Sequence, residues 1–243
     1  LPKVELHHHI EGAAQPELVR RMAQEKGLNL SNIFDGSGAY VYADFLQFLD
    51  VYEHAVRPFQ TPEAYARLTR SNLEEAAAPN VVYLETFVSP AFCGGGDVTA
   101  WREYIHAIRE AAEAVQGIEM RVIVTPVRHF GPDPARDAAA CAQETAGDFV
   151  TGFGIGGDEN AGHLSEFAYA FDAAREAGLG LTAHAGEWGG PRSVRDAIER
   201  GPSHRAVAQG GRARHGVHRR PPVLPHDDDT GIRGTGAGLR LGR

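Results

Sequence analysis

The chain has 243 residues, of which 42% are hydrophobic and 23% charged, and its 24 basic against 32 acidic residues give a net charge of −8. This acidic balance argues against a nucleic-acid-binding domain, whose surface is normally basic. We find neither a run of about 18 apolar residues nor a basic segment leading into an apolar one, so we expect a soluble, cytoplasmic protein that does not bind a membrane. Cys93 and Cys141 form no CxxC pair, which favours two buried, unreactive thiols over a disulfide or thiolate zinc site.

Patterns typical of strands and helices alternate along residues 1–200. The apolar and β-branched runs that predict strands are Val4–His9, Val81–Val88, Met120–Val127, Phe149–Ile155 and Leu179–His184. The amphipathic or capped runs that predict helices are Pro16–Lys26, Tyr42–Val56, a run starting at Thr61-Pro62, Trp101–Val115, Pro134–Thr145, Leu164–Ala177 and Pro191–Ile198. Strands that alternate with helices indicate an α/β fold with a parallel sheet.

Residues 201–243 have a different composition from the rest of the chain. They contain eight Arg, three Asp, nine Gly and four Pro, with no aromatic residue, and carry a net charge of +5 against −13 for residues 1–200. Such a segment has too little apolar surface to offset the entropy of ordering it. We therefore expect one domain over residues 1–200 and an irregular basic tail over 201–243, disordered or out of frame.

Histidines stand at the ends of two predicted strands. The first strand ends in His7-His8-His9, and because side chains alternate along a strand, His7 and His9 share a face that His8 does not. The fifth ends in Thr-Ala-His-Ala-Gly-Glu, which supplies His184 and Glu187. Neutral imidazoles with a nearby carboxylate are what zinc hydrolysis requires. HxH alone is a weak motif, since a three-histidine run is also compatible with an expression remnant and His8 with a structural role.

Three segments together resemble the adenosine deaminase family of metal-dependent barrels. They are PKVELHHHIEG at residues 2–12, GGDE at 156–159 and TAHAGE at 182–187, and the resemblance covers about residues 1–199. It implies a TIM-type (β/α) barrel, one Zn²⁺ ion and hydrolytic removal of the purine 6-amino group as ammonia. About five of the eight βα units of such a barrel are present, so we expect an incomplete one.

The resemblance also assigns roles to individual residues. His7, His9 and His184 are the expected zinc ligands, with His9 also beside the substrate, and Glu187 is the expected proton donor to the purine ring. Gly157 is expected to present its backbone to the purine, although a simple strand-end turn is the alternative. Glu11 stands where members acting on adenosine usually carry an Asp facing the sugar, and a longer carboxylate also occurs in relatives acting on free adenine.

For other candidates a structural role competes with a functional one. An aromatic stripe at helical spacing, Phe45, Phe48 and Tyr52, could line an apolar substrate pocket but is more typical of a core. Arg128 and His129 are expected to be structural, and Asp158 and Glu159 either orient neighbours or are solvated.

The sequence departs from the family pattern after Glu187. The family has a later strand ending in Gly-His-Gly and another ending in Asp-Asp-Pro, and His215-Gly216 and Asp227–Asp229 do not stand in those contexts. We therefore expect a C-terminally truncated chain with a frameshift after about residue 200. In a shifted frame, codons for Gly216–Pro221 can encode Val-Ser-Thr-Asp-Asp-Pro, which resembles the missing metal motif.

These observations lead to one expected function and two alternatives. The expected function is zinc-dependent deamination of adenosine to inosine, with the activity of this chain in doubt. The first alternative is an adenine deaminase acting on the free base, and the second is an inert, non-enzymatic fragment that at most binds zinc weakly. The expected partner is a small-molecule purine, with no nucleic acid and no membrane, and the oligomeric state is left open.

Overall fold

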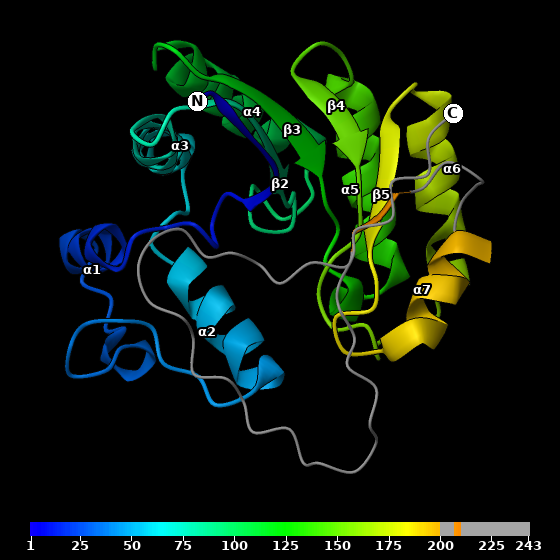
Figure 1. Ribbon diagram of the computed structural model, residues 1–243, viewed down its shortest axis with the longest axis horizontal. Helices are drawn as coiled ribbons and strands as arrows, with labels where there is room; N and C mark the ends of the chain where they lie inside the picture. Colours follow the sequence, from blue (N-terminus) through cyan, green and yellow to red (C-terminus); the bar gives the residue numbers. More distant parts are fainter. Residues whose placement is uncertain (200–206, 210–243) are drawn as a thin grey trace.

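The computed structural model describes residues 1–199 and 207–209 (Figure 1). Its sheet has six parallel strands that pair in chain order, β1-β2-β3-β4-β5-β6. They are β1 (Lys3–His9), β2 (Val81–Val88), β3 (Glu119–Val124), β4 (Val150–Phe153), β5 (Gly180–His184) and β6 (Val207–Gln209). Strands added one after another by helical crossovers are the repeating unit of a TIM-type barrel.

Helices connect the strands. They are α1 (Pro16–Glu25), α2 (Phe45–Val56), α3 (Pro62–Ala77), α4 (Val98–Glu113), α5 (Pro132–Thr145), α6 (Ala168–Glu176) and α7 (Gly190–Glu199), with 3-10 turns η1 (Ser31–Ile33), η2 (Arg128–Phe130) and η3 (Leu164–Phe167). Three helices, α1, η1 and α2, lie between β1 and α3, where the sequence spacing is longest. In Figure 1 this insertion forms the blue and cyan part of the molecule, to one side of the sheet.

Side-chain caps determine where several helices begin. The carboxylate of Asp44 accepts a hydrogen bond from the Gln47 amide at 2.9 Å, so α2 starts at Phe45 rather than at the predicted Tyr42. Asp97 does the same for the Ala100 amide at 2.8 Å and starts α4 before the predicted Trp101. Each cap satisfies an amide that the helix itself leaves without a partner.

The hydrophobic core lies between the sheet and its helices. Trp101 of α4 is fully buried, and Phe153 of β4 meets Phe171 of α6 edge to face, with ring centroids 5.3 Å apart. Cys93 and Cys141 are free and buried, as the sequence analysis expected. Within the part of the chain that the structure describes, no helix is both long and apolar enough to cross a membrane.

The sheet is strongly curved. β1 and β5 have three strands between them, which in a flat sheet would put them about 19 Å apart with side chains perpendicular to the sheet. Instead, the imidazoles of His9 and His184, at the ends of β1 and β5, approach to 3.0 Å. The strands therefore curl into part of a barrel, which confirms the expected incomplete (β/α) barrel.

The structure corrects one expectation about the tail. β6 lies within the segment 201–243, for which we expected no regular structure, and pairs with β5 through Thr182↔Val207, Ala183↔Ala208 and His184↔Gln209. β6 pairs with β5 through backbone groups that the edge of β5 leaves available, and this pairing does not depend on the side chains. A strand of three residues is also too short to show an alternating pattern in the sequence. The rest of the expected tail, and the expected frameshift, fall on residues outside those described.

Candidate metal centre and active site

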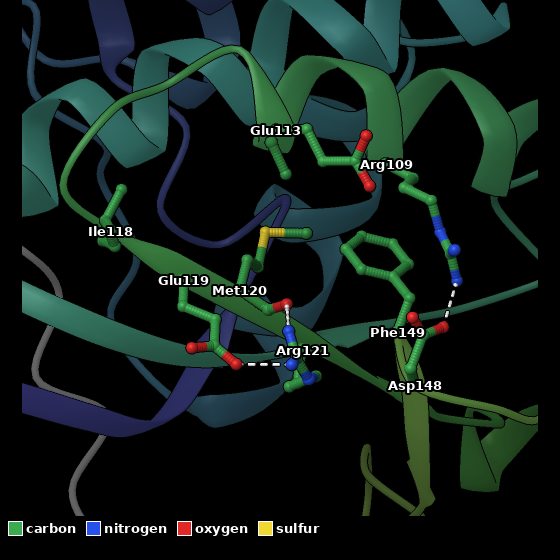
Figure 2. Close-up of a pocket in the computed structure, with 9 residues that line it drawn as sticks. Arg109, Glu113, Ile118, Glu119, Met120, Arg121, Asp148 and Phe149 are labelled. Carbon is green, nitrogen blue, oxygen red and sulfur yellow. Dashed lines mark hydrogen bonds and ion pairs between the residues drawn. The ribbon is translucent and has the colours of Figure 1, made fainter.

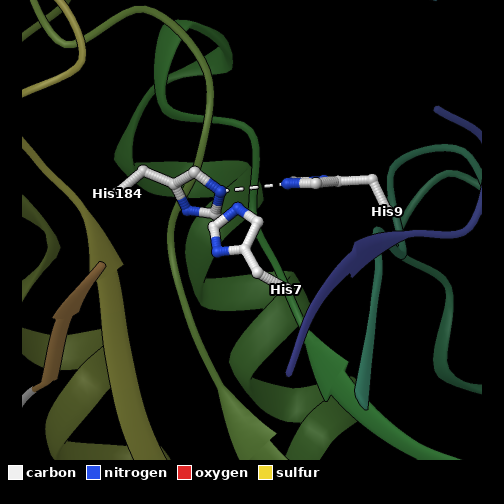
Figure 3. A group of neighbouring side chains, drawn as sticks. All are labelled: His7, His9 and His184. Atoms are coloured by element: carbon white, nitrogen blue, oxygen red, sulfur yellow. Dashed lines mark hydrogen bonds between the residues drawn. The ribbon is translucent and has the colours of Figure 1, made fainter. Parts of the chain in front are cut away.

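Three histidines converge at the carboxyl ends of β1 and β5 (Figure 3). His7 and His9 come from β1 and His184 from β5, and one ligand atom from each lies within 4.8 Å of the other two. His9 Nε2 and His184 Nε2 are 3.0 Å apart. At most one proton fits between two nitrogens at that distance, so at least one of the two nitrogens carries a lone pair on the side that faces the other.

The environment of His184 prepares it to bind a metal. Its Nδ1 lies 2.8 Å from the carbonyl oxygen of Ile155 and donates its proton there, which leaves the lone pair on Nε2. Burial, and next the neighbouring His7, lower the pKa of His184 to about 4, so the ring is neutral at pH 7. A neutral imidazole fixed by a backbone carbonyl is a common arrangement for a zinc ligand.

The aromatic ring of Phe87 packs against all three histidines. Phe87, buried at the end of β2, lies with its ring centroid 4.7 Å from that of His9, 4.9 Å from that of His7 and 5.0 Å from that of His184. Such an apolar neighbour keeps water away from one side of the imidazoles and lowers the local dielectric. The residues present therefore fit a metal ion held by three imidazoles.

His8 takes no part in the cluster. Its Nδ1 lies 2.8 Å from the hydroxyl oxygen of Thr86 on β2, so it faces away from His7 and His9, as the alternation along a strand predicts. Burial, and next the neighbouring His7, lower the pKa of His8 to about 4. Its contact is structural.

Glu187 follows β5 by three residues and is half-buried. Burial, and next the charge of Glu159, raise the pKa of its carboxyl group to about 7. A carboxyl group with that pKa holds a proton for a substantial fraction of the time at neutral pH, and it can donate that proton.

Glu159 is buried behind Glu187 and is fully hydrogen-bonded. Its carboxylate accepts from the backbone amides of Gly186, Trp188 and Gly189 and from the Ser193 hydroxyl, at 2.5 to 2.8 Å. Although burial acts to raise it, these hydrogen bonds hold the pKa of Glu159 below its ordinary value. We had left two roles open for Glu159, orientation of its neighbours and a solvated side chain. The hydrogen bonds that it accepts agree with the first role.

Glu11 follows β1 and is 5% exposed. Its two oxygens accept hydrogen bonds from the Tyr52 hydroxyl at 2.8 Å and the Tyr65 hydroxyl at 2.7 Å. Burial raises the pKa of Glu11, while these two hydrogen bonds act to lower it. Tyr52 is thus a hydrogen-bond donor to a buried carboxyl group, a contact that neither the pocket-wall nor the core interpretation of the aromatic stripe included.

Gly157 stands where only glycine fits. Its φ is +100°, and an added Cβ would lie 2.8 Å from Nδ1 of His129.

His129 itself accepts from the Asp158 amide through Nδ1 at 3.3 Å and contacts the Glu53 carboxylate through Nε2 at 3.0 Å. The Arg128 guanidinium donates to the carbonyls of Ala161 and Gly162 at 2.9 and 3.0 Å. The contacts of both side chains are of the structural kind that we expected.

A cavity of about 210 Å³ lies at the opposite end of the strands, beside the starts of β3 and β4 (Figure 2). Four of the charged residues that line it form two ion pairs, Arg109 with Asp148 at 3.0 Å and Arg121 with Glu119. In parallel α/β barrels the chemistry occurs at the carboxyl ends of the strands. This cavity is therefore separate from the histidine cluster.

Comparison with known proteins identifies the family. The family model described as adenosine deaminase matches residues 2–219. The chain belongs to the adenosine deaminase family. Its fold agrees with that of a solved adenine deaminase from Arthrobacter aurescens, with a TM-score of 0.68 and 28% identity over 82% of this chain and 62% of that one. An amidohydrolase from Burkholderia ambifaria with bound Zn has a TM-score of 0.69 and 32% identity over 82% of this chain and 56% of that one.

Curated relatives in the adenosine deaminase family carry a more specific name. The chain is 48% identical over 201 residues to an adenine deaminase from Chelativorans sp. (strain BNC1) and 45% identical over 202 residues to one from Rhizobium leguminosarum. Each match covers 82% of this chain, which spans 62% of the length of these relatives. These names favour the alternative, adenine, over the adenosine that we expected first.

Proposed function

We propose that this member of the adenosine deaminase family deaminates free adenine hydrolytically, to hypoxanthine and ammonia, with a zinc ion held by His7, His9 and His184. One observation carries the proposal: β5 and the loop after it place two suitable side chains close together. His184 has a lone pair on Nε2 that can bind a metal, and Glu187 has a pKa of about 7, so it can donate a proton. We also propose that residues 1–200 form one adenosine deaminase-like domain.

Each site residue has a task in this reaction. Bound zinc supplies a Lewis acid that lowers the pKa of water toward about 7. Glu187 donates a proton to the ring nitrogen N1, which draws electron density from C6 and makes it a better electrophile. The backbone of Gly157 faces the purine ring, and His9 lies beside the reacting end of the ring.

The surroundings of Glu11 support the free base as substrate. A carboxylate that recognises a sugar must be accessible to the sugar hydroxyl, whereas Glu11 is 5% exposed and its two oxygens already accept hydrogen bonds from Tyr52 and Tyr65. Separating this carboxyl group from Tyr52 or Tyr65 would leave a buried polar group without its partner, at a cost of roughly 1–3 kcal/mol. Adenosine is the second candidate, since the matching family model is described by that activity.

The test is deamination by the purified 243-residue chain loaded with zinc. Ammonia release is measured with adenine and with adenosine, beside Glu187→Gln as the inactive control and Glu176→Gln, an exposed glutamate of α6, as the matched control. We expect turnover of adenine that Glu187→Gln abolishes and Glu176→Gln preserves. Turnover of adenosine alone would overturn the substrate assignment. No turnover of either by a folded, zinc-loaded chain would overturn the activity and support an inert zinc-binding protein.

A further inference from the structure

We propose that Glu159 is a positioning residue that ties the turn carrying Gly157 to the loop carrying Glu187, so that the two elements facing the purine keep a fixed spacing. The inference rests on the proposed function in one respect, namely that Gly157 and Glu187 contact the same ring. The tie itself rests only on hydrogen bonds within the chain.

The loop after β5 wraps around the Glu159 carboxylate. The amides of Gly186, Trp188 and Gly189 all donate to it, so the donors lie on both sides of Glu187 in the sequence. The Ser193 hydroxyl of α7 adds a fourth donor at 2.8 Å. One side chain therefore determines the path of the backbone on either side of the proposed proton donor.

Glycines permit this close approach. Gly186 has a φ of +80°, and a Cβ there would lie 2.5 Å from Cγ2 of Val194. A Cβ at Gly189 would lie 2.7 Å from the Cβ of Ser193 and 3.3 Å from Oε2 of Glu159. Because neither position has room for a side chain, the loop can close on the carboxylate only with glycine at both.

The backbone on both sides of Glu159 is also held in place by hydrogen bonds. Arg128 of η2 donates to the carbonyls of Ala161 and Gly162 on one side of Glu159, and His129 accepts from the amide of Asp158 on the other. The ends of β3, β4 and β5 are thereby connected through side chains that bind backbone groups. A carboxylate that is 6% exposed keeps its charge at acceptable cost because four donors surround it.

Small displacements of Glu187 matter for catalysis. Proton transfer requires the donor and acceptor atoms to lie within hydrogen-bond reach, and a misplacement of about 1 Å can cost about 100-fold in rate. The four donors to Glu159 are three amides of the loop and the Ser193 hydroxyl of α7, so Glu159 acts on Glu187 by placing the loop, in addition to the upward effect of its charge on the pKa of Glu187.

The experiment replaces Glu159 by Gln in the full chain. The Gln side chain points N–H donors at amides that need an acceptor, so we expect backbone deuterium exchange at Gly186, Trp188 and Gly189 to quicken by about tenfold or more. We expect kcat for adenine to fall about 10- to 100-fold with KM within about threefold, and bound zinc to stay at the wild-type level. The matched control is Glu166→Gln, the same change at an exposed carboxylate that accepts from the His163 amide of its own turn. This variant should leave kcat unchanged, and also the exchange rates of Gly186, Trp188 and Gly189.

Each result bears on the inference. Wild-type exchange rates in Glu159→Gln would overturn the tie, and faster exchange with unchanged kcat would overturn the positioning role. If Glu159→Gln does not fold, Ser193→Ala removes one donor only and should give a smaller change in the same direction, and no change in either measurement would overturn the proposal. Absence of deamination by the wild-type chain would overturn the proposed function, while the exchange rates would still decide the tie.

Discussion

Two glutamates close together in space have opposite properties because their surroundings differ. Glu159 is ringed by amides and a hydroxyl that lower the pKa of its carboxyl group, whereas burial raises the pKa of Glu187 to about 7. Glu159 therefore stays ionised and anchors a loop, whereas Glu187 holds a proton for a substantial fraction of the time at neutral pH. Environments that separate the pKa values of paired titratable groups are typical of acid–base catalysis.

The raised pKa of Glu187 predicts a pH dependence of activity. Protonated Glu187 is the donor, so kcat/KM for adenine should be constant below about pH 7 on this limb and fall toward tenfold per pH unit above it. The measurement is a pH–rate profile from pH 5.5 to about 9. Glu176→Gln should keep this limb, and a rate that does not fall above about pH 7 would contradict Glu187 as the proton donor.

Removal of one imidazole should remove the metal. His184→Ala deletes a proposed ligand whose second nitrogen is held by Ile155, so we expect zinc content to fall at least tenfold. We also expect this variant to lose the gain in melting temperature that zinc gives the wild-type chain. Zinc content by elemental analysis and melting temperature with and without a chelator are the measurements. His106→Ala, an exposed histidine on α4, is the control, and zinc retained by His184→Ala would contradict the ligand set.

Among the elements, sequence patterns placed most strands and helices within a few residues of their observed bounds. The differences have local physical causes: the caps Asp44 and Asp97 determine the starts of α2 and α4, and the run Leu164–Ala177 divides into η3 and α6. Both capping aspartates were visible in the sequence, but choosing between a cap and an extra helical turn depends on backbone geometry.

A cap variant tests this account of α4. Asp97→Ala removes the acceptor of the Ala100 amide, and we expect the free energy of unfolding to fall by about 1 kcal/mol. Urea unfolding followed by circular dichroism is the measurement. Glu103→Ala, an exposed site inside the same helix, should stay within about 0.5 kcal/mol of wild type, and an equal loss in both variants would refute the capping role.

For the whole molecule, the sequence predicted which residues form the site but not how they are held. The HxH and HAGE motifs marked His7, His9, His184 and Glu187, and the resemblance to a family brought them together. The GGDE motif included Glu159 but left open whether it orients neighbours or is solvated, because three of its four partners are backbone amides, which every residue other than proline has. The tyrosine partners of Glu11 were likewise hidden, since helical spacing does not show which residue a side chain meets.

Within the part of the sheet that the structure describes, β1 is an edge strand, and this position predicts self-association. Among the described residues β1 pairs with β2 alone, and Val4 and Leu6 on it are 60% and 37% exposed. Such an edge can pair with another chain, and a charge on it opposes pairing. Val4→Lys should therefore lower concentration-dependent light scattering without changing zinc content. Thr151→Lys, a substitution on β4 inside the sheet, is the contrast and should not lower scattering.

The histidine cluster also joins distant parts of the chain, because His9 and His184 are 175 positions apart. The zinc ion that we propose there would cross-link a very long loop, and cross-links across loops of 100 residues or more restrict the unfolded chain by an amount equivalent to about 4–5 kcal/mol. β1 and β5 are not paired with each other, so this cross-link forms only when the three strands between them are in place. Zinc uptake, on this proposal, would report that folding is complete, because the three proposed ligands come together only in the folded chain.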